Sequence, residues 1–333
     1  MKRTLSITLL CCMAIALVVS ESSAESVRTW KIGHVRPAGS AIDKDVATFI
    51  KNVRENTGGS LDFEVFSGNK LGDYSIVQER VSFGEVEMFV GPFGTAADRR
   101  LALAFIPFLV TTWEQAQRLY SPSSPLLEHM RKFLESQNIK ILGGWPVYFG
   151  GIALTERPVS PEDPDIRKNI IIRVPPIRSF ELTARQLGYT PYPITWMYAK
   201  SGLRTGMVGG LIGGGAEGYK GLSNLVRYYL PVKDHFEYWF IYVNLELFNS
   251  LSQREQEAIG QAAAEMEMRR YLDAEDQERE SIAELRKRGV EVVEMNEATI
   301  KRMREKVKQN VWPVLREDIG PAFDEVVQFV EKG

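Results

Sequence analysis

A stretch of 36 residues near the C-terminus, residues 253–288, contains no proline and only one glycine, Gly260. Ser252 and Glu255 form a capping-box pattern just ahead of it, so the sequence predicts a helix over residues 253–288. At 1.5 Å per residue this helix would be roughly 54 Å long, whereas a small domain is only about 30 Å across. The helix must therefore project beyond one domain or lie across two. Two shorter helices broken near Asp273 are the alternative.

Ahead of this segment, strand and helix patterns alternate in two successive runs. The first run predicts strands at residues 29–35, 61–65 and 87–90, with helices that begin near Ser40 and Asp73; Ser40 is expected to cap its helix, with Asp43 three residues on. The second run begins with a strand at 140–144 and continues through strands at 170–174 and 207–212, with a helix at 179–187. This order predicts two α/β units, each with a parallel sheet whose carboxyl edge faces the ligand.

The first residues predict an export signal. Two basic residues precede an apolar run of 13 residues, 7–19, which is shorter than the roughly 20 residues needed to span a bilayer. Ser22 and Ala24 are the small residues that a signal peptidase requires, so we expect residues 1–24 to be a signal peptide, with a membrane anchor as the alternative. Cys11 and Cys12 lie inside this segment, so the mature chain is expected to have no thiol for catalysis, disulfides or soft metals.

Composition and motifs argue against nucleic-acid binding and against catalysis. The formal charge is −2, with 41 basic and 43 acidic side chains, so the net charge gives no electrostatic attraction for nucleic acid. The only histidines are His34, His129 and His235. His129 falls on a predicted solvent-facing helix, and the other two end strands and are candidates for a cleft. Because no His-Glu-x-x-His, calcium-loop or Gly-x-Ser-x-Gly pattern occurs, we expect no metal, no cofactor and no enzymatic activity.

A glycine-rich segment needs a separate explanation. Residues 213–218 match Gly-x-Gly-x-x-Gly, the dinucleotide fingerprint, and Asp234 follows at a suitable distance. A true fingerprint usually opens the first βαβ unit, whereas this segment lies two-thirds along the chain. We therefore favour a loop whose backbone passes close to another group, because glycine permits close approach. Such a loop still offers N–H donors to an anion.

Short motifs in a fixed order resemble the solute-binding proteins of tripartite ATP-independent periplasmic (TRAP) transporters. The central ones are residues 172–176 (Ile-Arg-Val-Pro-Pro) and 202–208 (Gly-Leu-Arg-Thr-Gly-Met-Val). Further matches, spread over nearly all of the predicted mature chain, are residues 31–35, 57–59, 70–72, 106–109, 157–159 and 247–251. Each motif alone is weak, whereas their shared order and spacing are specific.

The resemblance implies a two-domain periplasmic binding protein with hinge strands and a long helix that spans both domains. The N-terminal α/β domain would comprise residues 25–148 plus about 238–272, and the C-terminal one residues 149–237 plus about 273–333. It implies a protein that captures a small organic anion between the domains and delivers it to the small and large membrane subunits of a TRAP permease. A periplasmic ligand sensor for a receptor is the alternative, and an enzyme on the same scaffold is a weaker one.

The resemblance also implies which residues hold the ligand. Arg173 occupies the place of the family's ligand-clamping arginine, and a guanidinium pairs two-point with a carboxylate; a salt bridge to a local acid is the alternative. Where many members carry a second arginine and an asparagine, this chain has Gly150 and Gly213. We therefore expect a roomier pocket that holds the anion more weakly or through other residues. Such a pocket suits an aromatic or hydroxylated carboxylate or a phosphate ester. The predicted ligand-binding residues are Arg173, His34, Arg36, Phe93, Trp145, Tyr148, Gly213, Gly214, Glu217 and Trp239, with Arg178, Tyr238 and Phe149 as further candidates from the same segments.

Overall fold

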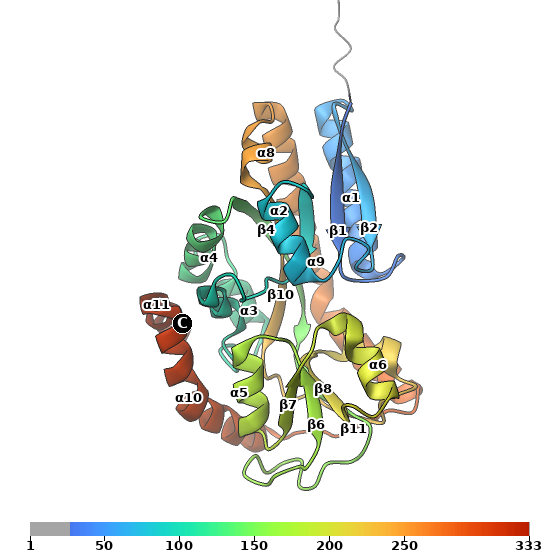
Figure 1. Cartoon of the computed structure of the whole chain (residues 1–333), viewed down its shortest axis with the longest axis vertical. Helices are drawn as coiled ribbons and strands as arrows, with labels where there is room; N and C mark the ends of the chain where they lie inside the picture. Colours follow the sequence, from blue (N-terminus) through green and yellow to red (C-terminus); the bar gives the residue numbers. More distant parts are fainter. Residues whose placement is uncertain (1–26, 333) are drawn as a thin grey trace, which may run out of the picture.

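A computed structural model describes residues 27–332 and contains two β-sheets, one above the other along the long axis of the molecule (Figure 1). The predicted signal peptide, residues 1–24, lies outside the described residues. We call the five-stranded sheet with its helices the first unit and the six-stranded sheet with its helices the second unit. None of the described helices is both long and apolar enough to cross a membrane.

The first unit has the strand order β2-β1-β3-β10-β4. Its strands are β1 (Arg28–His34), β2 (Leu61–Ser67), β3 (Met88–Gly91), β4 (Ile139–Phe149) and β10 (Phe236–Asn244). As predicted, β1 pairs in parallel with β2 and β3, whereas β10 runs antiparallel to both β3 and β4. The strand expected at 140–144 therefore belongs to the first sheet and does not open the second run. This strand belongs to the first sheet because it pairs with β10, which lies some 90 residues later in the chain. No local sequence pattern indicates such a pairing.

The second unit has the strand order β11-β9-β5-β8-β6-β7. Its strands are β5 (Gly151–Leu154), β6 (Ile171–Val174), β7 (Thr190–Pro193), β8 (Gly210–Gly214), β9 (Tyr228–Leu230) and β11 (Glu291–Val292). Strand β6 pairs in parallel with β7 and β8, and β5 runs antiparallel to β8 and β9. The predicted parallel core of this unit is thus present, extended by an antiparallel edge.

Helices pack around both sheets (Figure 1). They are α1 (Ala41–Thr57), α2 (Tyr74–Ser82), α3 (Trp113–Leu119), α4 (Pro125–Glu135), α5 (Arg178–Gln186), α6 (Ala199–Arg204), α7 (Ala216–Tyr219), α8 (Leu245–Asn249), α9 (Gln253–Lys287), α10 (Glu297–Ile319) and α11 (Pro321–Glu331), with 3₁₀ turns η1 (Arg99–Phe105), η2 (Trp196–Tyr198) and η3 (Lys220–Leu222). At the start of α1 the Ser40 side chain makes no capping hydrogen bond. Asp43 instead accepts from the Gly39 N–H and the Ser67 hydroxyl. Ser40 is therefore the N-cap residue, as predicted, but the expected capping-box hydrogen bonds are not formed.

Helix α9 confirms the prediction from its uninterrupted sequence. It runs unbroken for 35 residues, and the capping box of Ser252 and Glu255 is formed. The alternative, a break near Asp273, is therefore wrong. The helix packs against α1 and β4 of the first unit and against α7 and β11 of the second. The fold class, two α/β units with one long helix across both, is confirmed, while the domain boundaries near residues 148, 237 and 272 stay a prediction.

Besides α9, two further segments of the chain cross between the units, and they run side by side. Strand β4 continues into β5 through Gly150, and β9 continues into β10 through residues 231–235. The Gly150 N–H donates to the His235 carbonyl at 2.8 Å, and the Lys233 N–H donates to the Gly150 carbonyl at 3.0 Å. These bonds join the two crossing segments into one short ribbon, which is where a hinge between the units is expected.

Candidate ligand-binding site

A cavity lies between the two units. The first unit lines it with residues that follow β1, β2 and β3 and with residues of β4 and β10; the second unit contributes residues of β6, α5, η2 and β8. The cavity therefore sits at the carboxyl ends of the parallel strands, as the sheet order predicted.

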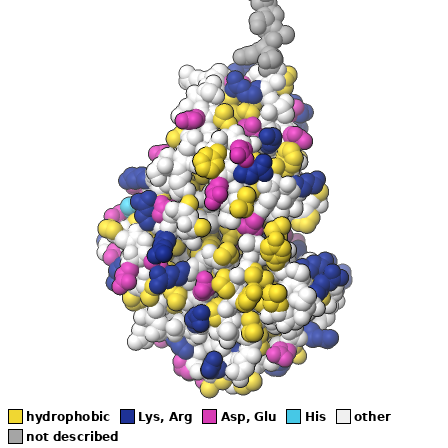
Figure 2. Space-filling view, in the orientation of Figure 1, with side chains coloured by type: hydrophobic (Ala, Val, Ile, Leu, Met, Phe, Trp, Pro, Cys, Tyr) yellow, Lys and Arg dark blue, Asp and Glu magenta, His cyan; other side chains and the backbone are white. Residues whose placement is uncertain are grey.

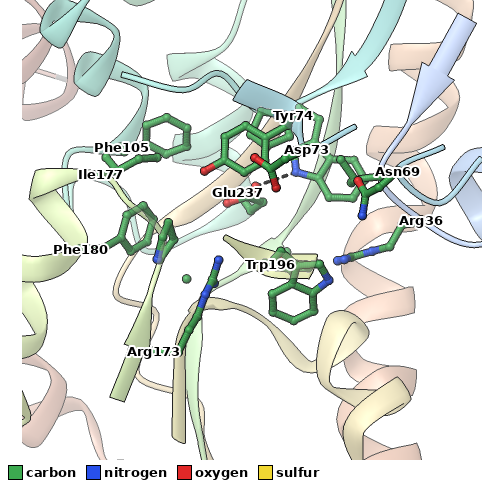
Figure 3. A pocket seen from close by; sticks show the side chains of 16 residues that line it. Arg36, Asn69, Asp73, Tyr74, Phe105, Arg173, Ile177, Phe180, Trp196 and Glu237 are labelled. Atoms are coloured by element: carbon green, nitrogen blue, oxygen red, sulfur yellow. Dashed lines mark hydrogen bonds between the residues drawn. The ribbon is translucent and has the colours of Figure 1, made fainter. Parts of the chain in front are cut away.

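Arg173 of β6 projects from the second unit into this cavity (Figure 3). Its side chain is buried, with 1% exposed. Nε donates to the Ile194 carbonyl at 2.8 Å and Nη1 to the Ile212 carbonyl at 3.4 Å. Within residues 27–332 no carboxylate lies within ion-pair distance of it, so the local salt bridge considered as an alternative is not formed. Burial lowers the pKa of this guanidinium, which nonetheless stays charged at neutral pH.

Arg36, in the loop after β1, is the second cation of the cavity and connects the two units. Its Nη2 lies 2.7 Å, and its Nε 3.0 Å, from Glu217 Oε2 on α7. The guanidinium also lies 5.6 Å from the ring centre of Trp196 and 4.9 Å from that of Trp239. Burial lowers the pKa of Arg36, but Glu217 and Tyr148 outweigh it and hold the value above normal. Arg36 is thus already neutralised, unlike Arg173.

Two buried carboxylates, Asp73 and Glu237, face the cavity from the first unit (Figure 3). The Asp73 Oδ1 caps α2 and accepts from Ser75, at 3.3 Å from its N–H and 3.1 Å from its hydroxyl. The Glu237 Oε1 accepts from Trp239 Nε1 at 2.6 Å. Its Oε2 lies 3.2 Å from His235 Nε2, close enough for an ion pair although the angle misses that of a hydrogen bond.

His235 is a buried cation in the crossing segment just behind the cavity. Its Nδ1 lies 2.8 Å from Asp234 Oδ2, and Phe180 packs edge-on against the ring at 4.8 Å between ring centres. Burial lowers the pKa of His235, but Asp234 and Glu237 outweigh it and raise the pKa to about 10. The imidazolium is therefore shared by two carboxylates, and the group of three keeps one net negative charge.

Aromatic side chains form most of the remaining wall. Tyr74 and Tyr148 are buried, and burial raises the pKa of both hydroxyls, so they remain protonated donors. Phe105 and Phe180 close one end, and Trp196 covers the other beside Arg36 (Figure 3). This lining suits a compact organic molecule with a few polar groups.

Five of the predicted ligand-binding residues line the cavity: Arg173, Arg36, Tyr148, Gly213 and Trp239. Glu217 lies in an adjoining outer groove and pairs with Arg36 rather than with solvent. Whether these residues bind a ligand stays a prediction.

Four predicted residues do not line the cavity. His34 is buried at the end of β1 and bonds to Asp43 at 3.0 Å. Phe93 packs against Phe240 and Tyr242 in the core. Trp145 stacks on Trp239 with 5.3 Å between the ring centres and donates to Asp45. Gly214 lies against the Tyr219 ring. The further candidates Tyr238, Phe149 and Arg178 are also outside it: Tyr238 and Phe149 are core residues, and Arg178 forms a surface pair with Asp318.

The expected extra room at the two glycines is wrong. A Cβ on Gly150 would meet His235 Nδ1 at 2.1 Å, and a Cβ on Gly213, whose φ is +81°, would meet Pro175 Cγ at 2.4 Å. At Gly215, in the same run, a Cβ would meet Tyr148 at 2.4 Å. The glycine-rich segment therefore does approach other groups closely, as favoured above, and those groups are the protein's own side chains.

Sequence reasoning missed the acidic half of the cavity. The pattern around Asp73 predicts only a helix start, and Glu237 lies between the candidates His235 and Trp239 without being predicted itself. Residues two apart on a strand lie on the same face. The prediction that Trp239 faces the cleft therefore also indicates that Glu237 faces it. Tyr74 and Trp196 were also missed, and no local pattern distinguishes them from core residues.

Exposed hydrophobic side chains gather on the second unit near β7 and α6 (Figure 2). Tyr192 is 41% exposed, Met197 47% and Tyr198 57%. Met197 lines the outer groove, which shares Arg36 and Trp196 with the cavity. The groove therefore adjoins the cavity at these two residues.

Comparison with known proteins agrees with this architecture. The family model for bacterial extracellular solute-binding protein, family 7 (DctP), matches residues 32–317. A solute-binding protein of Albidiferax ferrireducens is 23% identical over 312 residues, covering 90% of this chain and 89% of that protein.

Two solved structures illustrate the likeness in fold. The sugar acid binding protein DctPAm of Advenella mimigardefordensis, in complex with galactonate, gives a TM-score of 0.84 at 19% identity and covers 92% of this chain and 99% of that one. A TRAP periplasmic solute binding protein of Desulfovibrio salexigens with bound orotic acid gives 0.83 at 19%, covering 91% and 97%.

Proposed function

This chain belongs to family 7 of the bacterial extracellular solute-binding proteins, and we propose that Arg173 holds the carboxylate of a small organic acid between the two units. The single observation that carries this proposal is the guanidinium of Arg173, which is 1% exposed, faces the cavity and has no carboxylate within ion-pair distance among residues 27–332. A buried charge without a counter-ion is costly. An anionic ligand removes that cost, and a carboxylate accepts two parallel hydrogen bonds from the guanidinium.

The chain is a divergent solute-binding protein of the TRAP transporter type. We place it in the periplasm, where it would deliver the acid to the small and large membrane subunits of a permease. The solved relatives hold a sugar acid and an aromatic acid, and the aromatic wall of this cavity suits an acid of either kind. The cavity also argues against succinate-like diacids, because Arg36, the other nearby cation, is already paired with Glu217.

The test is a thermal-shift screen of residues 25–333 against sugar acids, aromatic acids, other organic acids and phosphate esters. An acid present at 100 times its dissociation constant stabilises the protein by about 2.7 kcal/mol, which raises the melting temperature by several degrees. The variant Arg173→Met should abolish the shift, since a charge-assisted bidentate contact contributes about 3 kcal/mol, or roughly 100-fold in affinity.

The matched control is Arg178→Met, which removes an arginine that pairs with Asp318 on the surface outside the cavity. It should leave every shift unchanged. The proposal fails if carboxylates stabilise Arg173→Met as strongly as wild type, or if phosphate esters alone produce shifts.

A further inference from the structure

The wall opposite Arg173 carries more negative charge than the protein neutralises. Asp73 and Glu237 are each 7% exposed and line the cavity. Among the described residues no lysine or arginine lies within ion-pair distance of either carboxylate; His235 is the cation that Glu237 contacts. Figure 3 shows both carboxylates beside Tyr74, across the cavity from the Arg173 guanidinium.

The local partners of these carboxylates leave acceptor capacity free. Asp73 uses Oδ1 for Ser75, and no hydrogen bond to its Oδ2 occurs within the described chain. Glu237 contacts His235, but that imidazole is also held by Asp234 at 2.8 Å. One imidazolium therefore serves two carboxylates, and Asp73 adds a further negative charge.

The remaining cations do not correct the imbalance. Arg36 is paired with Glu217, so it contributes no net charge. Arg173 supplies one positive charge, and the proposed function assigns it to the carboxylate of the ligand. Once that carboxylate is bound, Asp73 and Glu237 face no unpaired lysine or arginine among the described residues. Carboxylates that are desolvated without a charged or hydrogen-bonding partner are unfavourable.

We infer that the ligand is a zwitterion, with a cationic nitrogen that contacts Asp73 and Glu237 and a carboxylate that contacts Arg173. The inference rests on the proposed function and narrows its ligand class from organic acids to amino-bearing acids. The nitrogen would donate to the free oxygen of Asp73 and to Glu237, and the ring of Tyr74 beside these carboxylates adds a face that attracts cations. A second carboxylate or a phosphate at this wall would be repelled.

The test uses pairs of probes that share a skeleton and differ at one amino group. Suitable pairs are 2-amino-2-deoxygluconate with gluconate and phenylalanine with 3-phenylpropionate. Dissociation constants are measured by isothermal titration calorimetry on residues 25–333. In the pair that fits the cavity, we expect the amino acid to bind about 10- to 100-fold more tightly than its partner, the range for a hydrogen bond between charged groups.

Two variants locate the preference. Glu237→Gln keeps an oxygen for the Trp239 N–H, and Asp73→Asn keeps one for Ser75, so each removes charge and preserves the local bonds. Each should reduce the preference for the amino probe about tenfold and leave binding of the amine-free probe unchanged or tighter. Glu267→Gln is the matched control: this glutamate bonds to Tyr238 and the Gly144 N–H and lines neither the cavity nor the groove.

The outcomes separate this inference from the proposed function. If amine-free probes bind as tightly as their amino partners, or if Glu237→Gln and Asp73→Asn weaken both members of a pair equally, the zwitterion inference is wrong and the proposed function stands. If no acid of the thermal-shift screen binds, or if binding is indifferent to Arg173→Met, both are wrong. A preference that persists in both carboxylate variants also overturns the inference.

Discussion

Replacing Gly150 by alanine should destabilise the protein markedly, because the new methyl group would collide with a buried charged ring. The alanine Cβ would lie 2.1 Å from His235 Nδ1 and 2.7 Å from Asp234 Oδ1. The ring cannot simply swing away, since Asp234, Glu237 and the edge-on ring of Phe180 surround it. The backbone of Gly150 cannot retreat either, as it bonds to the opposite crossing segment in both directions.

The magnitude follows from the two ways in which the clash can be relieved. Displacing His235 from Asp234 sacrifices a charge-assisted hydrogen bond, which contributes about 1.5–3 kcal/mol. Residual overpacking in a filled site costs about 1–3 kcal/mol more. Gly150→Ala should therefore lower the free energy of unfolding by roughly 3–5 kcal/mol, and a protein of this size should melt roughly 6–10 °C lower. A larger side chain, arginine included, should be worse.

The assay is urea unfolding and thermal melting of residues 25–333. The matched control is Gly221→Ala, because a Cβ at Gly221 meets nothing within 4 Å and its φ is not positive. The control should unfold within about 0.5 kcal/mol of wild type. If Gly150→Ala were as stable as Gly221→Ala, the argument that His235 occupies the space of a side chain at position 150 would be refuted.

Two other contacts give testable outcomes. Glu217→Gln removes the charge that ties Arg36 across the two units. Because Glu217 is 22% exposed, we expect the free energy of unfolding in urea to fall by about 1 kcal/mol. The surface change Glu128→Gln should have no effect, and an equal loss in both variants would contradict the role of the pair. His235 has a pKa raised from 6.5 to about 10, so the native state binds more protons than the unfolded state between these values. The free energy of unfolding should then fall by up to about 1.4 kcal/mol per pH unit as the pH rises from 6.5 to 10. If His235→Gln lost the same free energy of unfolding over this pH range, this histidine would be ruled out as the source.

Helix α9 could be predicted because every signal for it is local. The capping box at Ser252 and Glu255 sets its start, and the absence of breakers up to Gly289 sets its length. Its length in turn predicted an architecture of two units, since one unit is too small to contain it. Arg173 was predicted from the resemblance of residues 172–176 to a family motif, and it lines the cavity, while its role in binding stays a prediction.

The acidic wall could not be found by the same reasoning. Glu237 reaches the cavity because β10 inserts between β3 and β4 of the first sheet, and that pairing joins segments about 90 to 150 residues apart. The role of Gly150 was likewise invisible, because the ring that fills its space belongs to His235 on another crossing segment. Strand pairing between distant segments leaves no local trace in either segment.

The most direct test of the central assignment is a crystal structure of residues 25–333 with the acid that gives the largest thermal shift. The account predicts the carboxylate of that acid within hydrogen-bond distance of the Arg173 guanidinium, in the cavity between the two sheets. A carboxylate bound elsewhere, with Arg173 facing solvent or a protein carboxylate, would contradict it.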